Sequence, residues 1–227
     1  AITFDDGFEN NLSEAAPILK KYNVPACFYV ASSFIEKNGM SWIDQIELCL
    51  ERFSPKELIM PWQTKPYNLD NVELEKSFLN EVRKNVKGSK NINPNEIVQI
   101  IYNQCGEKVI ASSDDPLDQK LTWAQAHELS RDPLFTVGAH THTHAILGYL
   151  NRAQMKIEID TPIEMLKSKA DISEVRHFSY PEGFRGSFTE ETIRLLKTRG
   201  VVCSPTAIKG INGAGSDPFR LFRIMVD

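Results

Sequence analysis

Short apolar runs of β-branched and aromatic residues alternate with stretches of helical periodicity along this chain, and this alternation constrains the fold most strongly. Strands are predicted at residues 2–4, 26–31, 135–138, 177–180 and 201–203. Helices are predicted between them at 12–22, 151–169 and 189–199, the last with Thr189 as its N-cap and Gly200 as its stop. Repeated strand, helix and strand predict an α/β fold with a parallel sheet, either open or closed into a barrel.

The stretch from about residue 42 to residue 131 breaks this rhythm, because it contains helical patterns and no convincing strand. Helices are predicted at 43–53, 74–86 and 94–102, and a capping box at Thr122 opens another. Three prolines favour a loop over 54–72. A chain of 227 residues has the size of one domain. We therefore expect a single domain, 1–227, with a helical insertion at about 42–131. The simpler interpretation of the insertion is a scaffold, and the functional alternative is a lid or substrate wall.

Charge gives no reason to expect a nucleic-acid partner, since 26 Lys and Arg face 30 Asp and Glu and the net charge is −4. No apolar run approaches the roughly 18 residues of a membrane span, so no transmembrane segment is expected. No signal peptide is recognisable, but the chain opens on what reads as a strand end, and an upstream export signal could have been removed. The compartment is therefore left open, with a slight preference for the cytoplasm.

Two acids follow the first strand directly, as Asp5-Asp6-Gly7. Neighbouring strand residues point to opposite faces, so both carboxylates can converge only if the strand ends there, and Gly7 permits the sharp turn. The carboxyl ends of strands are where α/β folds place their chemistry. The alternative interpretation is a pair of solvated turn acids or helix caps.

Three of the five histidines fall within five residues, in His140-Thr141-His142-Thr143-His144. A helical turn would put His140 and His144 on one face, whereas an extended segment would align all three. Neutral imidazole is the commonest metal ligand, and one added carboxylate gives a set that suits zinc. We therefore predict a divalent metal in preference to structural or solvent-exposed histidines.

Together these clusters resemble the first two motifs of the polysaccharide deacetylases, the NodB-homology group of carbohydrate esterases. The segment 179–183, Ser-Tyr-Pro-Glu-Gly, resembles the third motif, and the three occur in the family's order. The resemblance implies a distorted (β/α) barrel, usually of seven strands. It also implies that Asp6, His140 and His144 bind the metal, most simply Zn²⁺, and that Asp5 is the general base. His142 occupies a variable position and is not counted as a ligand.

The third motif also implies a substrate-binding loop formed by Tyr180, Pro181, Glu182 and Gly183, with a backbone N–H that stabilises the oxyanion. Three features depart from the family pattern. Glu182 stands where the family usually has an aromatic residue, which implies a changed sugar platform. Ser179 stands where an arginine often holds the base, so Arg223 is our candidate substitute. No histidine follows His177, so the general acid that amide hydrolysis needs is not identified: either the late strand that carries it lies beyond Asp227, or another group donates the proton.

The function implied is metal-dependent hydrolysis of N-acetyl or O-acetyl groups on an amino sugar, oligosaccharide or polysaccharide, with an acetylated carbohydrate as partner. The missing late histidine and Ser179 leave open a carbohydrate-binding pseudoenzyme that keeps the metal. A relative that hydrolyses a non-sugar amide or a cyclic imide is a third alternative.

Overall fold

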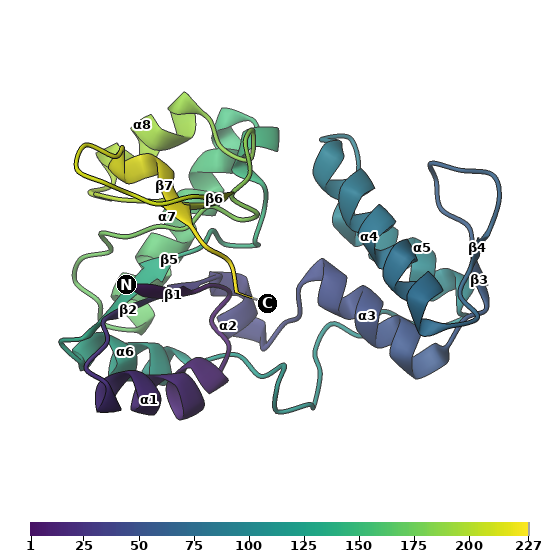
Figure 1. Cartoon of the computed structure of the whole chain (residues 1–227), viewed down its shortest axis with the longest axis horizontal. Helices are drawn as coiled ribbons and strands as arrows, with labels where there is room; N and C mark the ends of the chain where they lie inside the picture. The colour runs from purple at the N-terminus through teal and green to yellow at the C-terminus, as the bar shows by residue number, and fades with distance from the viewer. Residues whose placement is uncertain (227) are drawn as a thin grey trace. The chain divides into compact units, whose positions relative to one another are not determined.

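Three of the predicted strands pair side by side in parallel, in the order β1–β2–β5 (Figure 1). They are β1 (Ile2–Phe4), β2 (Ala26–Val30) and β5 (Phe135–Ala139). Phe4 pairs with Phe28, which pairs with Val137, so the carboxyl ends of the three strands lie at one edge. The structure, a computed structural model, describes residues 1–226. The predicted parallel α/β sheet is confirmed here.

The parallel pairing continues beyond β5 in shorter pieces. Ala139 bridges Phe178, and His177 bridges Cys203. β6 (Pro205–Lys209) then pairs in parallel with β7 (Leu221–Arg223). The strands predicted at 177–180 and 201–203 are thus reduced to single bridges. The closed seven-stranded barrel stays a prediction.

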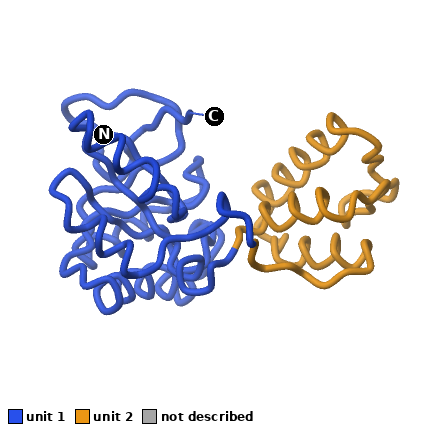
Figure 2. Tube along the Cα trace, turned by 90° about the horizontal axis from the view of Figure 1, so that it is seen from below, with its two compact units in different colours: residues 1–39, 114–227 blue, residues 40–113 orange. Residues whose placement is uncertain are grey.

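Helices pack against this sheet within a unit formed by residues 1–39 and 114–226 (Figure 2). They are α1 (Ala16–Lys21), entered through a π turn at Asn11–Ala15, α2 (Ser32–Lys37), α6 (Trp123–Arg131), α7 (Arg152–Lys169) and α8 (Glu190–Thr198), with 3₁₀ turns at Leu147–Tyr149 and Pro218–Arg220. The predicted capping residues Thr122 and Thr189 both accept from the N3 backbone N–H, and these helix starts are confirmed. α2 was not predicted, because its sequence continues the apolar run of β2.

Residues 40–113 form a second compact unit with a hydrophobic core of its own. Its elements are α3 (Trp42–Phe53), β3 (Glu57–Leu58), β4 (Tyr67–Asn68), α4 (Val72–Gly88) and α5 (Pro94–Gln104). Ile46, Phe78 and Ile101 are buried at its centre. The loop predicted at 54–72 contains the antiparallel pair β3–β4, which buries Leu58, so that part of the loop prediction is wrong. The single domain with an insertion stays a prediction.

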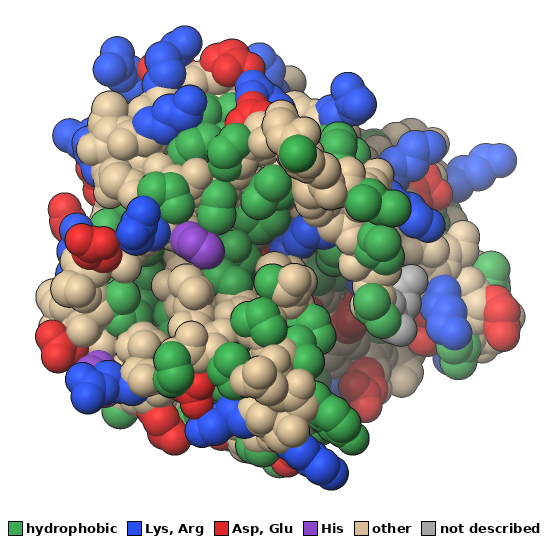
Figure 3. All heavy atoms as spheres, turned by 60° about the vertical axis from the view of Figure 1, so that its left-hand side comes forward, with side chains coloured by type: hydrophobic (Ala, Val, Ile, Leu, Met, Phe, Trp, Pro, Cys, Tyr) green, Lys and Arg blue, Asp and Glu red, His purple; other side chains and the backbone are tan. Residues whose placement is uncertain are grey.

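The surface of the chain carries charges of both signs. The face in Figure 3 shows basic and acidic side chains interspersed with apolar ones. No helix within residues 1–226 combines the length and the apolar character that a bilayer-crossing segment needs.

Candidate metal centre

The turn after β1 re-aims two adjacent acids. Asp6 and Gly7 both have positive φ, 71° and 77°, so the strand ends sharply at Phe4. A Cβ at Gly7 would lie 3.1 Å from Val30 Cγ1, so this position has little room for a side chain in addition to its left-handed backbone. The predicted turn at Gly7 therefore exists, and it allows both carboxylates to face the same edge of the sheet.

The histidine segment follows β5 as an irregular turn. His140 N–H still donates to Val30 O at 2.9 Å, in continuation of the sheet. Thr141 and His144 then adopt positive φ, 62° and 59°. Neither a helical turn nor an extended segment describes this loop, so both backbone alternatives raised from the sequence are wrong. Left-handed conformations cost energy in non-glycine residues and persist only when surrounding contacts hold them.

Glu158 on α7 supplies such contacts and was not singled out from the sequence. Its Oε2 accepts from the backbone N–H groups of His142 and Thr143 at 2.9 and 2.8 Å, and its Oε1 accepts from Thr143 Oγ1 at 2.7 Å. Glu158 is buried on the same helix as Met155 and Ile159. A glutamate on the core-facing side of a helix is uncommon. This position was the feature of the sequence that could have identified Glu158 as a functional candidate.

Three ligand atoms converge between the two segments. Asp6 Oδ1 lies 3.6 Å from His140 Nε2 and 3.4 Å from His144 Nε2, and all three atoms lie within 4.8 Å of one another. Ligands about 2.05 Å from a tetrahedral zinc ion would be separated by about 3.3 Å. Asp6 Oδ1 is also buried without a hydrogen-bond partner in the described part of the chain. An orphaned carboxylate oxygen facing two imidazole nitrogens fits a divalent cation.

The surroundings of His140 prepare it as a ligand. Its Nδ1 donates to Ser179 O at 2.9 Å, which leaves the lone pair of Nε2 toward Asp6. Burial lowers the pKa of His140, which favours the neutral form that binds metals. His142 differs, since its Nδ1 lies 2.8 Å from Ser32 Oγ. The structure thus brings His140 and His144 together with Asp6, and directs His142 elsewhere.

Asp5 is held by an arginine from the far end of the chain. Arg223 Nη1 donates to Asp5 Oδ1 and Nη2 to Oδ2, both at 2.9 Å. Arg223 Nε donates to Thr206 O at 2.7 Å, which fixes the guanidinium, and Ser179 Oγ donates to Asp5 Oδ2 at 3.3 Å. Burial acts to raise the pKa of Asp5, but the charge of His140 when that residue is protonated and the hydrogen bonds and charge of Arg223 outweigh burial and hold that pKa below its ordinary value. Asp5 is therefore an ionised, oriented carboxylate 3.9 Å from His140 Nε2.

Comparison with known proteins agrees with this arrangement. A sequence model of a family described as polysaccharide deacetylase matches residues 1–203. The chain belongs to the polysaccharide deacetylase family. No curated protein sequence matches it.

Solved structures share the fold of this deacetylase-family chain at low sequence identity. The Streptococcus pyogenes deacetylase PplD matches with a TM-score of 0.57 at 16% identity, and the match covers 99% of this chain and 62% of PplD. IcaB from Ammonifex degensii matches at 0.54 and 19%, covering 99% and 66%. The BpsB deacetylase domain from Bordetella bronchiseptica matches at 0.55 and 16%, covering 97% and 68%. The chain thus spans 62% of the length of the first of these proteins.

The loop that resembles the third deacetylase motif adjoins the candidate centre through Ser179. Tyr180 is fully buried: its hydroxyl donates to Phe219 O at 3.0 Å and its ring stacks on Phe188. Gly183 has φ 54°, and a Cβ there would lie 2.2 Å from Ala207 N. The Tyr180 ring therefore belongs to the core of the deacetylase fold. Substrate contact by the loop, including Pro181 and Glu182, stays a prediction.

His177 lies apart from this chemistry. Its Nδ1 is 3.6 Å from Cys27 Sγ, and burial together with Arg176 lowers its pKa. This placement agrees with a strand residue and gives His177 no contact with the candidate ligands.

Proposed function

We propose that this chain is a metal-dependent amide hydrolase that removes N-acetyl groups from an amino sugar, an oligosaccharide or a polysaccharide. One observation carries the proposal: the three ligand atoms of Asp6, His140 and His144 converge beside a carboxylate that Arg223 grips with two hydrogen bonds. Family membership supports the reaction class. PplD is described in complex with acetate, which is the acid that hydrolysis of an acetamide releases.

The residues of the candidate site have two roles: some would hold a cation, and one accepts a proton. Asp6, His140 and His144 would hold a divalent ion, for which their N/N/O set favours zinc. When bound, such an ion supplies a Lewis acid for the acetamide carbonyl and lowers the pKa of water. Asp5 is ionised and accepts the proton of the attacking water as general base. Arg223 keeps that carboxylate turned toward the centre.

The leaving amine must also be protonated. In our mechanism Asp5 holds the proton that it takes from water and returns it to the amine nitrogen. Arg223 assists by remaining bound to the carboxyl in both states. One carboxyl group then serves as base and acid in turn.

Ser179, which stands where the family often has an arginine, motivates one competing function, a carbohydrate-binding pseudoenzyme that retains the metal centre without turnover. O-acetyl hydrolysis is a close variant, since an ester needs no strong acid for its leaving group. Hydrolysis of a non-sugar amide or a cyclic imide would use the same base.

The deciding experiment measures acetate released from N-acetylglucosamine oligomers by the zinc-loaded chain. We expect release that is lost in Asp5→Asn while zinc binding is kept, and release that is unchanged in Asp70→Asn, an exposed acid in the second unit. Asp6→Asn should lose both zinc and activity. Stoichiometric zinc without acetate from any acetylated sugar would replace the hydrolase with the pseudoenzyme.

A further inference from the structure

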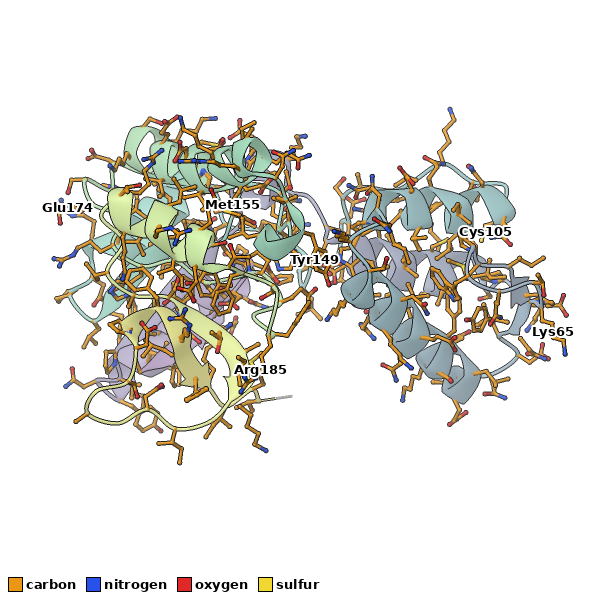
Figure 4. The ribbon with its side chains drawn as sticks, turned by 90° about the horizontal axis from the view of Figure 1, so that it is seen from above. Lys65, Cys105, Tyr149, Met155, Glu174 and Arg185 are labelled. Atoms are coloured by element: carbon orange, nitrogen blue, oxygen red, sulfur yellow. The ribbon has the colours of Figure 1, made fainter. Side chains whose placement is uncertain are left out.

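Two cysteine thiols meet in the second unit, outside the candidate metal centre. Cys49 Sγ on α3 lies 3.7 Å from Cys105 Sγ, and the two residues are 56 positions apart in the sequence. Cys105 directly follows the last residue of α5 (Figure 4). Both are free thiols. A disulfide bond is about 2.05 Å long, so the two sulfur atoms would have to approach by about 1.6 Å to form a covalent link.

The two thiols differ in exposure, which gives them different roles. Cys49 is fully buried in the core of the second unit, whereas Cys105 is partly exposed. Only Cys105 can therefore meet a dissolved reagent in the folded chain. Its backbone can also adjust, because it lies at the helix C-cap and is followed by Gly106 with φ 73°.

We propose that Cys49 and Cys105 form a dithiol site that a small-molecule disulfide oxidises to an intramolecular disulfide joining α3 to the end of α5. The reagent class is a disulfide such as oxidised glutathione. The site acts within residues 40–113 and does not depend on the proposed hydrolase function.

The oxidation proceeds by two thiol–disulfide exchanges. The Cys105 thiolate attacks one sulfur of the reagent, so that a mixed disulfide forms and one reagent thiolate leaves. Cys49 then gives up its proton and attacks Cys105 Sγ, which forms the protein disulfide and expels the second reagent thiolate. The protein loses two protons and two electrons, and the reagent disulfide gains them as two thiols.

The burial of Cys49 limits the rate of the second exchange. Burial, with the neighbouring Cys105 thiol, raises the pKa of Cys49 to about 12. The attacking thiolate is therefore scarce at neutral pH, and raising the pH should speed ring closure. The disulfide would form in an oxidising compartment and be absent from a reducing one.

The product has a measurable consequence for folding. A disulfide across 56 positions restricts the unfolded chain and so stabilises the folded one. We therefore expect the oxidised chain to unfold at a higher temperature than the reduced chain, and the difference to vanish in Cys105→Ser.

The test incubates the native full chain with excess oxidised glutathione, then unfolds it in denaturant with N-ethylmaleimide to block all remaining thiols, and weighs intact protein and peptides. The wild type should lose two hydrogen masses and yield a linked peptide pair containing Cys49 and Cys105, with Cys27 and Cys203 alkylated. Cys49→Ser should stop at one glutathione on Cys105, whereas Cys203→Ser should behave like the wild type. Full alkylation of Cys49 and Cys105, a mixed disulfide in the wild type that never closes, or a different pairing would each overturn the proposal.

Discussion

Glu158 gives the sharpest test of how the histidine loop is held. Glu158→Gln keeps the shape of the side chain but removes its charge. Two backbone N–H groups donate to its Oε2 at 2.9 and 2.8 Å. Hydrogen bonds to charged groups contribute about 1 kcal/mol more than neutral ones, so the change weakens the loop by about 2 kcal/mol in total. If the ordered loop is the form that binds metal, zinc affinity falls by about 30-fold.

The assay is a competition titration of zinc against a chromophoric chelator, run beside thermal unfolding of the metal-free protein. Glu164→Gln is the matched control, because Glu164 is exposed on the same helix, α7. We expect weaker zinc binding in Glu158→Gln, unchanged binding in the control, and recovery of acetate release when zinc is saturating.

Measuring zinc affinity distinguishes two roles of Glu158, namely positioning the histidine loop for the cation and stabilising the fold. A variant that unfolds at a lower temperature yet binds zinc as tightly as the wild type would show that Glu158 stabilises α7 packing and does not hold the ligand loop for the cation. That result would refute the reasoning above.

Three further changes probe the remaining parts of the site. Arg223→Lys keeps a charge but cannot grip both oxygens of Asp5, so kcat should fall by about tenfold or more with zinc affinity unchanged; full activity would mean that the bidentate grip is dispensable. Gly7→Ala puts a side chain at φ 77°, so urea unfolding should show a loss of about 1–2 kcal/mol, and an unaltered midpoint would contradict the strain argument. Tyr180→Phe removes a buried hydrogen bond, so stability should fall by about 1 kcal/mol while KM stays constant; a raised KM at unchanged stability would instead assign the hydroxyl to substrate.

Local signals in the sequence were sufficient for much of the frame. Thr122 and Thr189 were found because capping is decided within one helical turn. β1, β2 and β5 were found because each run is apolar and bounded by turn residues. α2 and the β3–β4 pair were missed, since the first continues a strand-like run and the second is two residues long on each side.

The site was predictable as a set of residue types and not as a geometry. Asp6, His140 and His144 were named from motifs, but the left-handed backbone at Asp6 and His144 is imposed by tertiary contacts that no short window contains. Glu158 lies on α7, outside the histidine loop that it holds. In the sequence, only its position on the buried face of that helix could have identified it as a functional residue. Arg223 was a candidate on chemistry alone, and the structure supplies its two bonds to Asp5.

The bond between Asp5 and Arg223 spans 218 positions of sequence. During synthesis the Asp5 carboxylate can meet the Arg223 guanidinium only after all of the intervening chain has left the ribosome. Assembly of this clamp therefore requires the closure of a long loop, and we expect it to be a late event of folding.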